Sequence, residues 1–184
     1  MGELTLVLGG ARSGKSTYAE KLALQAGGKV VYIATAEARD EEMAERIQKH
    51  QAQRPSSWQT LEIPHDVGDY LLQHPLAAGV EVVLLDCLTL LATNVMLAAS
   101  PDPEVVDEAG VETAVNAEIQ SLLSTIQDSA ARWIVVSNEV GLGLVPPYPL
   151  GRLFRDVVGR ANQQLAQAAD TVVFMIAGLP MPLK

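Results

Sequence analysis

The sequence predicts an α/β fold in which a largely parallel sheet is covered by helices on both faces. Apolar runs of strand-forming residues recur along the chain, and amphipathic segments with helical spacing separate them. A glycine-rich loop lies between the first apolar run and the first helical segment. With 184 residues, of which 48% are hydrophobic and 19% charged, the composition suits one globular domain spanning residues 1–184.

The first strand is expected at residues 4–8 and the first helix at 16–24, on either side of a loop that fits G-x-x-x-x-G-K-[ST]. The residues of this loop are Gly9, Gly10, Ala11, Arg12, Ser13, Gly14, Lys15 and Ser16. Its glycines let backbone N–H groups wrap a polyphosphate, Lys15 would reach the β- and γ-phosphates, and the Ser16 hydroxyl would hold Mg²⁺. A turn that only links two elements is the alternative, but the order strand, loop, helix favours a P-loop NTPase-like, RecA-like fold.

The rest of the chain continues the alternation of strands and helices. Further strands are expected at 29–35, 80–86, 133–137 and 171–176, with a short extended piece at 60–63. Helices are expected at 39–53, 66–73, 88–99, 111–127 and 150–168. Prolines mark residues 100–110 and 141–149 as loops.

Charge and composition exclude several classes of function. A net charge of −9 leaves no basic stripe for general nucleic-acid binding. The single cysteine, Cys87, forms no internal disulfide and suits a reducing cytoplasm. Acidic Glu3 argues against a secretory signal, and the longest apolar tract, near 172–183, is interrupted by prolines and is too short to span a bilayer. We therefore expect a cytoplasmic protein without membrane insertion.

Ligands of parallel sheets bind beyond the carboxyl ends of the strands, so residues at strand ends are candidates for the site. Asp86 ends an apolar strand and would bind Mg²⁺ directly or through water. The alternative is that Asp86 caps the helix beginning at Leu88. Glu139 follows the strand at 133–137 and is equally compatible with an active-site role and with a solvated loop.

His50 stands out on the charged helix at 39–53, because Arg46 and Arg54 lie about one turn before and after it. Two cationic neighbours would disfavour the imidazolium, leave a ring nitrogen available as a nucleophile, and bind the phosphates that it attacks. An ordinary surface histidine is the alternative, and spacing alone favours it. His65 would only precede a helix, and His74, before Pro75, would end one.

An ordered set of motifs resembles the bifunctional adenosylcobinamide kinase / adenosylcobinamide-phosphate guanylyltransferase family of cobalamin synthesis. The set comprises 9–16, 32–36, 42–50 running to Arg54-Pro55, 58–62, 86–89 with Thr93-Asn94, 137–146, 154–156 and 159–163. It covers almost the whole chain and is far more specific than the glycine-rich loop alone.

The resemblance implies that His50 attacks the α-phosphate of GTP, carries GMP, and passes it to adenosylcobinamide phosphate to give adenosylcobinamide-GDP. It also implies prior phosphorylation of adenosylcobinamide from ATP or GTP with Mg²⁺, and a homo-oligomer, for which the family suggests a trimer. The glycine-rich loop with Lys15 would serve both reactions. Further nucleotide contacts are implied at Ala34, Thr35, Ala36, Gln51, Ala52, Gln53, Arg54, Glu62 and Asp86.

Two other functions stay compatible with the residues themselves. One is a simple small-molecule kinase in which His50 is only structural, and the other is a nucleotide switch whose loops at 100–110 and 141–149 engage a partner. The chain has no N-K-x-D element for reading guanine, so the preference for GTP rests on the resemblance. Lys49 stands where some family members carry a second histidine, which removes one rival nucleophile.

Overall fold

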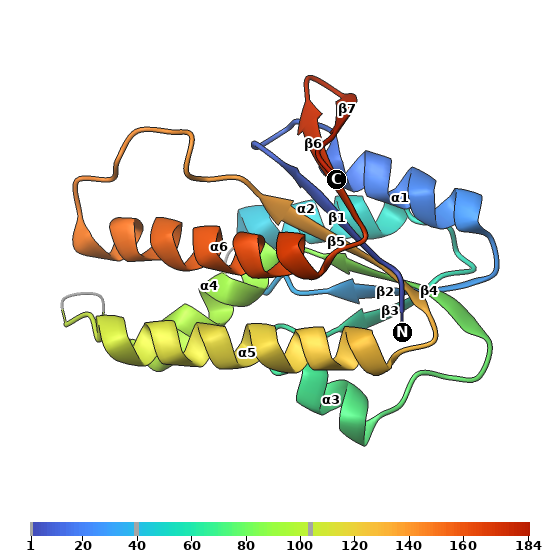
Figure 1. Cartoon of the computed structure of the whole chain (residues 1–184), viewed down its shortest axis with the longest axis horizontal. Helices are drawn as coiled ribbons and strands as arrows, with labels where there is room; N and C mark the ends of the chain where they lie inside the picture. Colours follow the sequence, from blue (N-terminus) through green and yellow to red (C-terminus); the bar gives the residue numbers. More distant parts are fainter. Residues whose placement is uncertain (1, 39–40, 103–104) are drawn as a thin grey trace.

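A computed structural model describes residues 2–38, 41–102 and 105–184 and shows one seven-stranded sheet (Figure 1). The strands are β1 (Leu4–Gly9), β2 (Lys29–Ala34), β3 (Gln59–Glu62), β4 (Val80–Asp86), β5 (Arg132–Asn138), β6 (Thr171–Ile176) and β7 (Leu179–Pro182). Their order across the sheet is β3-β2-β4-β5-β1-β6-β7. All neighbours pair in parallel except β6 and β7. The predicted α/β class with a largely parallel sheet is therefore confirmed.

Helices cover both faces of this sheet, as the continuous apolar strands predicted. They are α1 (Lys15–Ala26), α2 (Glu41–Gln53), α3 (Val67–Gln73), α4 (Leu88–Ala99), α5 (Glu108–Asp128) and α6 (Pro149–Ala168). Ala19 and Ala23 of α1 pack on one face, against a cluster that includes Tyr32 and Val82. The helices α3 to α6 pack on the other face, around a larger cluster that includes fully buried Trp133. Within the described ranges, no helix is long and apolar enough to cross a membrane.

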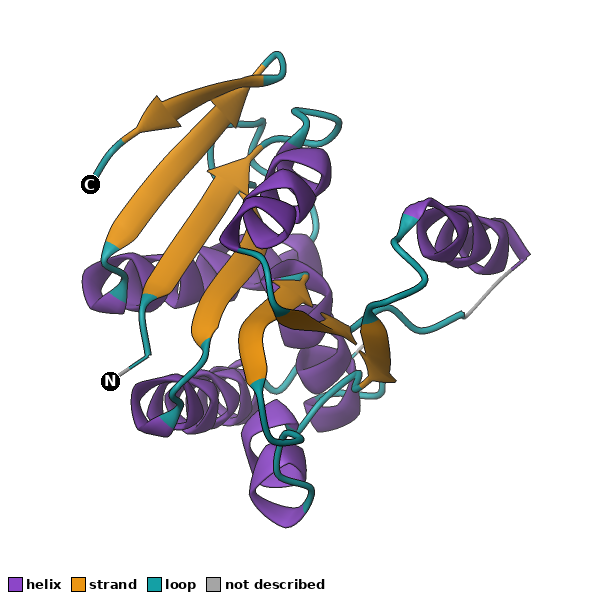
Figure 2. Ribbon diagram, turned by 90° about the vertical axis from the view of Figure 1, so that its right-hand side faces the viewer, coloured by secondary structure: helices purple, strands orange, loops and turns teal. Residues whose placement is uncertain are grey.

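The helix α2 differs from the others because it stands apart from the sheet, beyond the edge strand β3 (Figure 2). None of its described side chains belongs to either core cluster. The helix was predicted to begin at Arg39, which lies, with Asp40, outside the described residues. The predicted nucleophile, His50, therefore lies on a helix that is less constrained by core packing than the strands of the sheet are.

Two predicted loop boundaries were wrong and one strand was missed, each for a local reason. The loop at 100–110 ends early, because the Asp107 carboxylate accepts a hydrogen bond from the Gly110 N–H (3.0 Å) and starts α5 at Glu108. Pro149, placed in the loop at 141–149, is the first residue of α6, where a missing N–H costs nothing. The strand β7 was not predicted, because its two prolines are tolerated only at the edge of a sheet.

Candidate active site

The glycine-rich loop joins β1 to α1, in the order strand, loop, helix that the motif requires. Gly14 adopts a left-handed conformation (φ 93°) and is the N-cap of α1. A Cβ at Gly9 would lie 2.6 Å from the carbonyl oxygen of Met175, so this position admits glycine alone. The Gly178 N–H donates to the carbonyl of Ser13 (2.9 Å) and ties the loop to the turn between β6 and β7. The loop is thus shaped by close packing against neighbouring backbone.

Two side chains of the loop point to an anion as its ligand. Lys15 is 7% exposed and folds back, so that its Nζ donates to the Gly10 carbonyl (2.7 Å) across the turn. Burial lowers the pKa of Lys15, while Cys87 and Asp86 oppose that shift. The Ser13 hydroxyl is buried without a hydrogen-bond partner among the described residues. An ammonium group and a hydroxyl inside a glycine-rich turn at a helix N-terminus are groups suited to binding a phosphate.

Asp86 lies at the carboxyl end of β4 and faces this loop. Its Oδ2 accepts a hydrogen bond from the Tyr32 hydroxyl (3.0 Å), and its charge acts on Lys15. The alternative of a helix cap was wrong, because the N-cap of α4 is Cys87, whose side chain makes no capping hydrogen bond. The carboxylate is therefore held by the sheet at the edge where a ligand would bind.

The residues at this edge fit Mg²⁺ better than a metal with a complete protein cage. Within the described part of the chain, no three His, Cys, Asp or Glu side chains group so that they could hold a metal. Mg²⁺ usually takes only one or two protein oxygens and completes its shell with phosphate oxygens and water. The Ser16 hydroxyl at the start of α1 and the Asp86 carboxylate are oxygens of this kind.

The helix α2 brings the predicted nucleophile and its neighbours towards the same region. His50 is exposed, and the guanidinium of Arg54 lies 3.5 Å above the centre of the Tyr32 ring. Gln51 donates from Nε2 to Oε1 of Glu62 (3.0 Å), which joins two predicted nucleotide contacts. The side chains of Arg46 and Gln53 lie outside the described residues, so of the two arginines predicted to flank His50 only Arg54 is described.

Glu20 of α1 was missed by the sequence analysis, although its charge interacts with Asp86 of β4 and with His50 and Arg54. Burial raises the pKa of Glu20 most, and Asp86 adds to the rise, whereas His50 and Arg54 lower it. The carboxyl therefore lies near all three groups. The signal was present in the spacing, because Glu20 follows Ser16 by one helical turn and shares its face.

Thr35 is fully buried, and its hydroxyl is already used within the protein. Its Oγ1 accepts from the Cys87 N–H and donates to the Cys87 carbonyl, both at 2.8 Å. The Asn94 amide donates to the Thr35 carbonyl (2.8 Å). Thr35 thus fixes the turn after β4, and contacts from 34–36 to a nucleotide would come from backbone groups or from half-buried Ala36.

Other predicted candidates take structural positions. The Glu139 N–H donates to the Gly9 carbonyl (3.0 Å), and its carboxylate accepts from the Gly141 N–H, so the side chain shapes its own loop. His65 pairs with Asp66 (2.7 Å) just before α3. His74 ends α3 and stacks on Tyr70 with 4.5 Å between ring centres. Both histidines lie where the sequence predicted.

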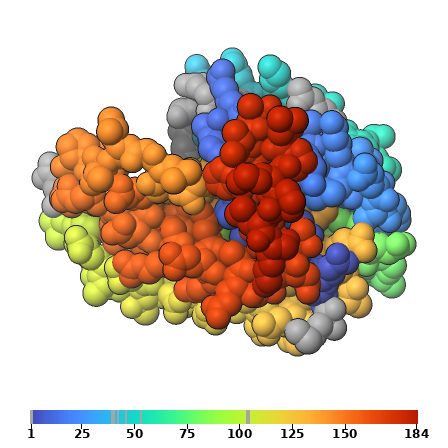
Figure 3. Space-filling view, turned by 45° about the horizontal axis from the view of Figure 1, so that its top comes forward, coloured from blue at the N-terminus to red at the C-terminus, as the bar shows by residue number. Residues whose placement is uncertain are grey.

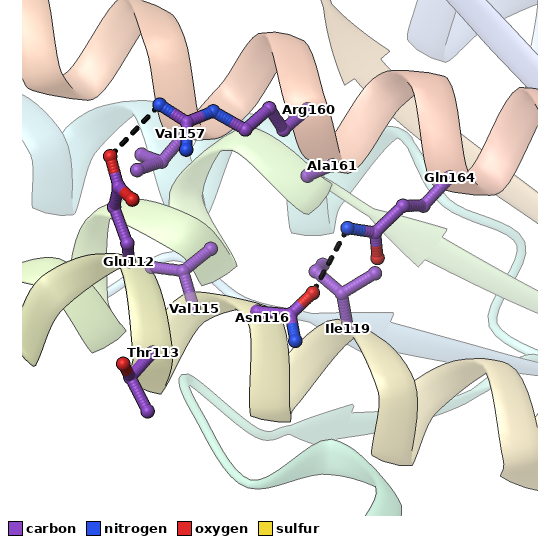
Figure 4. A pocket seen from close by; sticks show the side chains of 9 residues that line it. All are labelled: Glu112, Thr113, Val115, Asn116, Ile119, Val157, Arg160, Ala161 and Gln164. Atoms are coloured by element: carbon purple, nitrogen blue, oxygen red, sulfur yellow. Dashed lines mark hydrogen bonds and ion pairs between the residues drawn. The ribbon is translucent and has the colours of Figure 1, made fainter. Parts of the chain in front are cut away.

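A groove between α5 and α6 contains none of the predicted site residues (Figure 4). Arg160 donates to Glu112 (2.9 Å) and Gln164 to Asn116 (3.0 Å), so its polar groups satisfy one another across the two helices. These helices cover the face opposite α1. We assign the groove to helix packing.

The glycine-rich loop, the buried lysine, the strand-end aspartate and the parallel sheet define a P-loop nucleotide-binding protein. The family model for cobinamide kinase / cobinamide phosphate guanyltransferase matches residues 5–183, and the chain belongs to this family of transferases. The family predicted from the sequence motifs is thereby confirmed.

Three relatives are similar to this chain in sequence along nearly its whole length. Bifunctional adenosylcobalamin biosynthesis protein CobU is 43% identical in Escherichia coli and 44% identical in Salmonella typhimurium, with 98% of this chain and 99% of each relative covered. The corresponding protein CobP of Pseudomonas aeruginosa is 45% identical over 97% of this chain and 96% of its own length.

The fold itself is shared more widely. The crystal structure of the RadB recombinase matches with a TM-score of 0.52 and 17% identity, covering 94% of this chain and 73% of that chain. At this identity the match concerns the fold alone. It confirms the RecA-like arrangement that the glycine-rich loop and the alternating elements predicted.

Proposed function

We propose that this chain carries out both reactions of its family at one nucleotide site, which lies between the glycine-rich loop and α2. The observation that carries the proposal is a chain of contacts. Arg54, one turn after His50, lies on the Tyr32 ring, and the Tyr32 hydroxyl holds Asp86 close to Lys15. The predicted nucleophile and the phosphate loop are thereby parts of one connected arrangement.

In the kinase reaction, the hydroxyl of the aminopropanol arm of adenosylcobinamide attacks the γ-phosphorus of ATP or GTP. A new P–O bond forms, the bond to the β-phosphate oxygen breaks, the nucleoside diphosphate leaves, and the hydroxyl proton is released. Loop N–H groups and Lys15 bind the phosphates and stabilise the charge that develops on them. Ser16 and Asp86 would hold Mg²⁺, which when bound neutralises phosphate charge and orients the leaving group.

In the guanylyl transfer, a ring nitrogen of His50 attacks the α-phosphorus of GTP and pyrophosphate leaves. A phosphate oxygen of adenosylcobinamide phosphate then attacks the phosphorus of the GMP-histidine intermediate. The new P–O bond forms, the P–N bond breaks, and His50 is restored while adenosylcobinamide-GDP is released. Covalent catalysis divides one hard transfer into two easier ones. The Arg54 guanidinium, whose Nε and Nη1 are buried without partners in the described part of the chain, would bind phosphate oxygens.

Other nucleotide contacts are proposed around the same edge of the sheet. The residues are those of the loop at 9–16, with Ala34, Thr35, Ala36, Gln51, Ala52, Gln53, Glu62 and Asp86. The hydrogen bond between Gln51 and Glu62 supports this grouping, because it joins the end of α2 to the end of β3. The buried free Cys87 agrees with a cytoplasmic enzyme, which we also propose.

Labelled GTP tests the proposed function. After incubation with Mg²⁺ and denaturation, α-labelled GTP is expected to leave label on the protein, and γ-labelled GTP is not. The label should be lost in acid and kept in base, as for a phosphoramidate. Peptide mapping should locate it to His50. Phosphorylation of adenosylcobinamide without any α-label would identify a plain kinase and overturn the transferase proposal.

We also propose that the protein assembles as a homo-oligomer, in the form of the trimer that the family suggests, through the loop between β5 and α6. This loop projects at the left of Figure 3 and exposes Leu142 (82%), Leu144 (96%), Val145 (60%) and Tyr148 (59%). Residues 140–151 carry no charge in a chain with a net charge of −9. An uncharged, apolar patch stiffened by prolines suits burial against a second copy of the chain.

Mass measurement tests this assembly. Replacing Leu142 and Leu144 by serine is expected to convert the oligomer into monomers in light scattering. Leu72 of α3 is 74% exposed and far from the loop in sequence, and its Leu72→Ser variant is the matched control. An unchanged mass of the double variant would show that the copies do not meet at this loop.

A further inference from the structure

Tyr32 is a core residue with two polar neighbours at the candidate site. It is 2% exposed, on β2, in the cluster that packs against α1. Its hydroxyl donates to Oδ2 of Asp86 (3.0 Å), and its ring face lies under the guanidinium of Arg54 (3.5 Å). One rigid side chain therefore contacts both the strand-end carboxylate and the cation that follows the predicted nucleophile.

The contact with Arg54 is more than packing. The Nε and Nη1 atoms of Arg54 are buried and have no hydrogen-bond partner among the residues that the structure describes. Leaving charged donors buried and unpaired costs free energy, which the face of an aromatic ring offsets only in part. The remaining donors match an anionic acceptor, and phosphate oxygens are the anions that this site binds in the proposed function.

The contact with Asp86 also orients the Asp86 carboxylate. A buried tyrosine hydroxyl needs an acceptor, and here the acceptor is a carboxylate oxygen and not a backbone carbonyl. Burial, together with the charge of Asp86, raises the pKa of Tyr32, so the hydroxyl stays protonated and remains a donor. The hydrogen bond fixes the rotation of the carboxylate at the end of β4.

We propose that Tyr32 is a positioning residue that holds Arg54 and Asp86 in one arrangement around the nucleotide. Its ring orients the guanidinium towards the phosphates, and its hydroxyl orients the carboxylate towards the cation-binding side of the phosphate loop. This inference rests on the proposed function, and it gives a role to Tyr32, which the motif at 32–36 contains without assigning it one. Tyr32 itself touches neither reacting atom.

Two substitutions separate the roles of ring and hydroxyl. Tyr32→Phe keeps the ring and removes only the hydrogen bond to Asp86. It is expected to raise the Mg²⁺ concentration needed for half-maximal GTP binding about tenfold, since hydrogen bonds to charged groups are worth that much. Its affinity for GTP in excess chelator should stay within about twofold, because the cation–π contact is retained. Tyr32→Leu removes both the ring and the hydroxyl. It should show the same shift in Mg²⁺ dependence and, in addition, bind GTP about tenfold more weakly in chelator.

Calorimetric titration of the full-length protein with GTP, in chelator and over a series of Mg²⁺ concentrations, measures these effects without relying on turnover. Tyr18→Phe is the matched control, because Tyr18 is a partly buried tyrosine packed against the same cluster. It should bind like the wild type. Thermal unfolding of each variant shows that it is folded before titration.

A double-mutant cycle with Arg54 tests whether the Tyr32 ring acts through the guanidinium. Arg54→Leu should weaken GTP binding in chelator, and adding Tyr32→Leu should cause little further loss, because the ring acts through the guanidinium. Additive losses would overturn the proposal, as would an unchanged Mg²⁺ dependence in Tyr32→Phe, which is the variant least able to disturb folding. Failure of the wild type to form a GMP adduct would instead contradict the proposed function and leave these binding results unaffected.

Discussion

Replacing His50 by alanine is expected to abolish guanylyl transfer while leaving the kinase reaction intact. The imidazole is the nucleophile of the proposed transfer, and removing a nucleophile from a covalent mechanism lowers the rate by roughly 10⁴-fold or more. The kinase reaction does not pass through this ring, so its rate should stay within about threefold, as for an exposed position. Separate assays of adenosylcobinamide phosphorylation and of adenosylcobinamide-GDP formation measure the two outcomes.

The chain offers matched controls for this experiment, because it contains only three histidines. His65 is exposed like His50 but pairs with Asp66 before α3, and His65→Ala should keep both activities. Lys49→Ala tests whether the adjacent exposed position matters and should behave like the wild type. Label from α-labelled GTP retained on His50→Ala would contradict the assignment, since another residue would then carry the nucleotide.

The parallel sheet and the phosphate loop were predictable because their signals are local. Continuous apolar runs specify buried parallel strands, and the motif from Gly9 to Ser16 requires the conformations that Gly9 and Gly14 adopt. The strand β4 and the helix α4 lie at their predicted bounds. The strand β7 could not be predicted this way, because its prolines are acceptable only at an edge, and edge position is a property of the assembled sheet.

The candidate site was predictable in its residues more than in its contacts. Motifs assigned roles to Asp86 and Arg54, whereas their common neighbour Tyr32 begins the motif at 32–36 without a role of its own. Glu20 likewise resembles any charged residue on a helix, until the fold places it near His50, Arg54 and Asp86. Such relations depend on elements distant in sequence. A single sequence gives the chemistry of each side chain but not its partners.

Replacing Lys15 by alanine is expected to lower both activities by about 10²- to 10³-fold, which is the loss typical of removing one preorganised charge from a transition state. The two reactions attack different phosphorus atoms, but both begin from a triphosphate bound in the same loop. Loss of both with one substitution therefore distinguishes a shared nucleotide site from two separate sites. Affinity for GTP and ATP, measured by calorimetry, should fall in parallel with the rates.

Two further variants show that the charge is responsible. Lys15→Met keeps most of the side-chain volume at this buried position and should be as inactive as Lys15→Ala. Lys21→Ala removes an exposed lysine from the same helix and should retain both activities. Because burial lowers the pKa of Lys15, the wild type should lose GTP affinity with rising pH sooner than an ordinary lysine would allow, whereas Lys15→Met should not show this decline. Full guanylyl transfer by Lys15→Ala would place the nucleotide outside the glycine-rich loop.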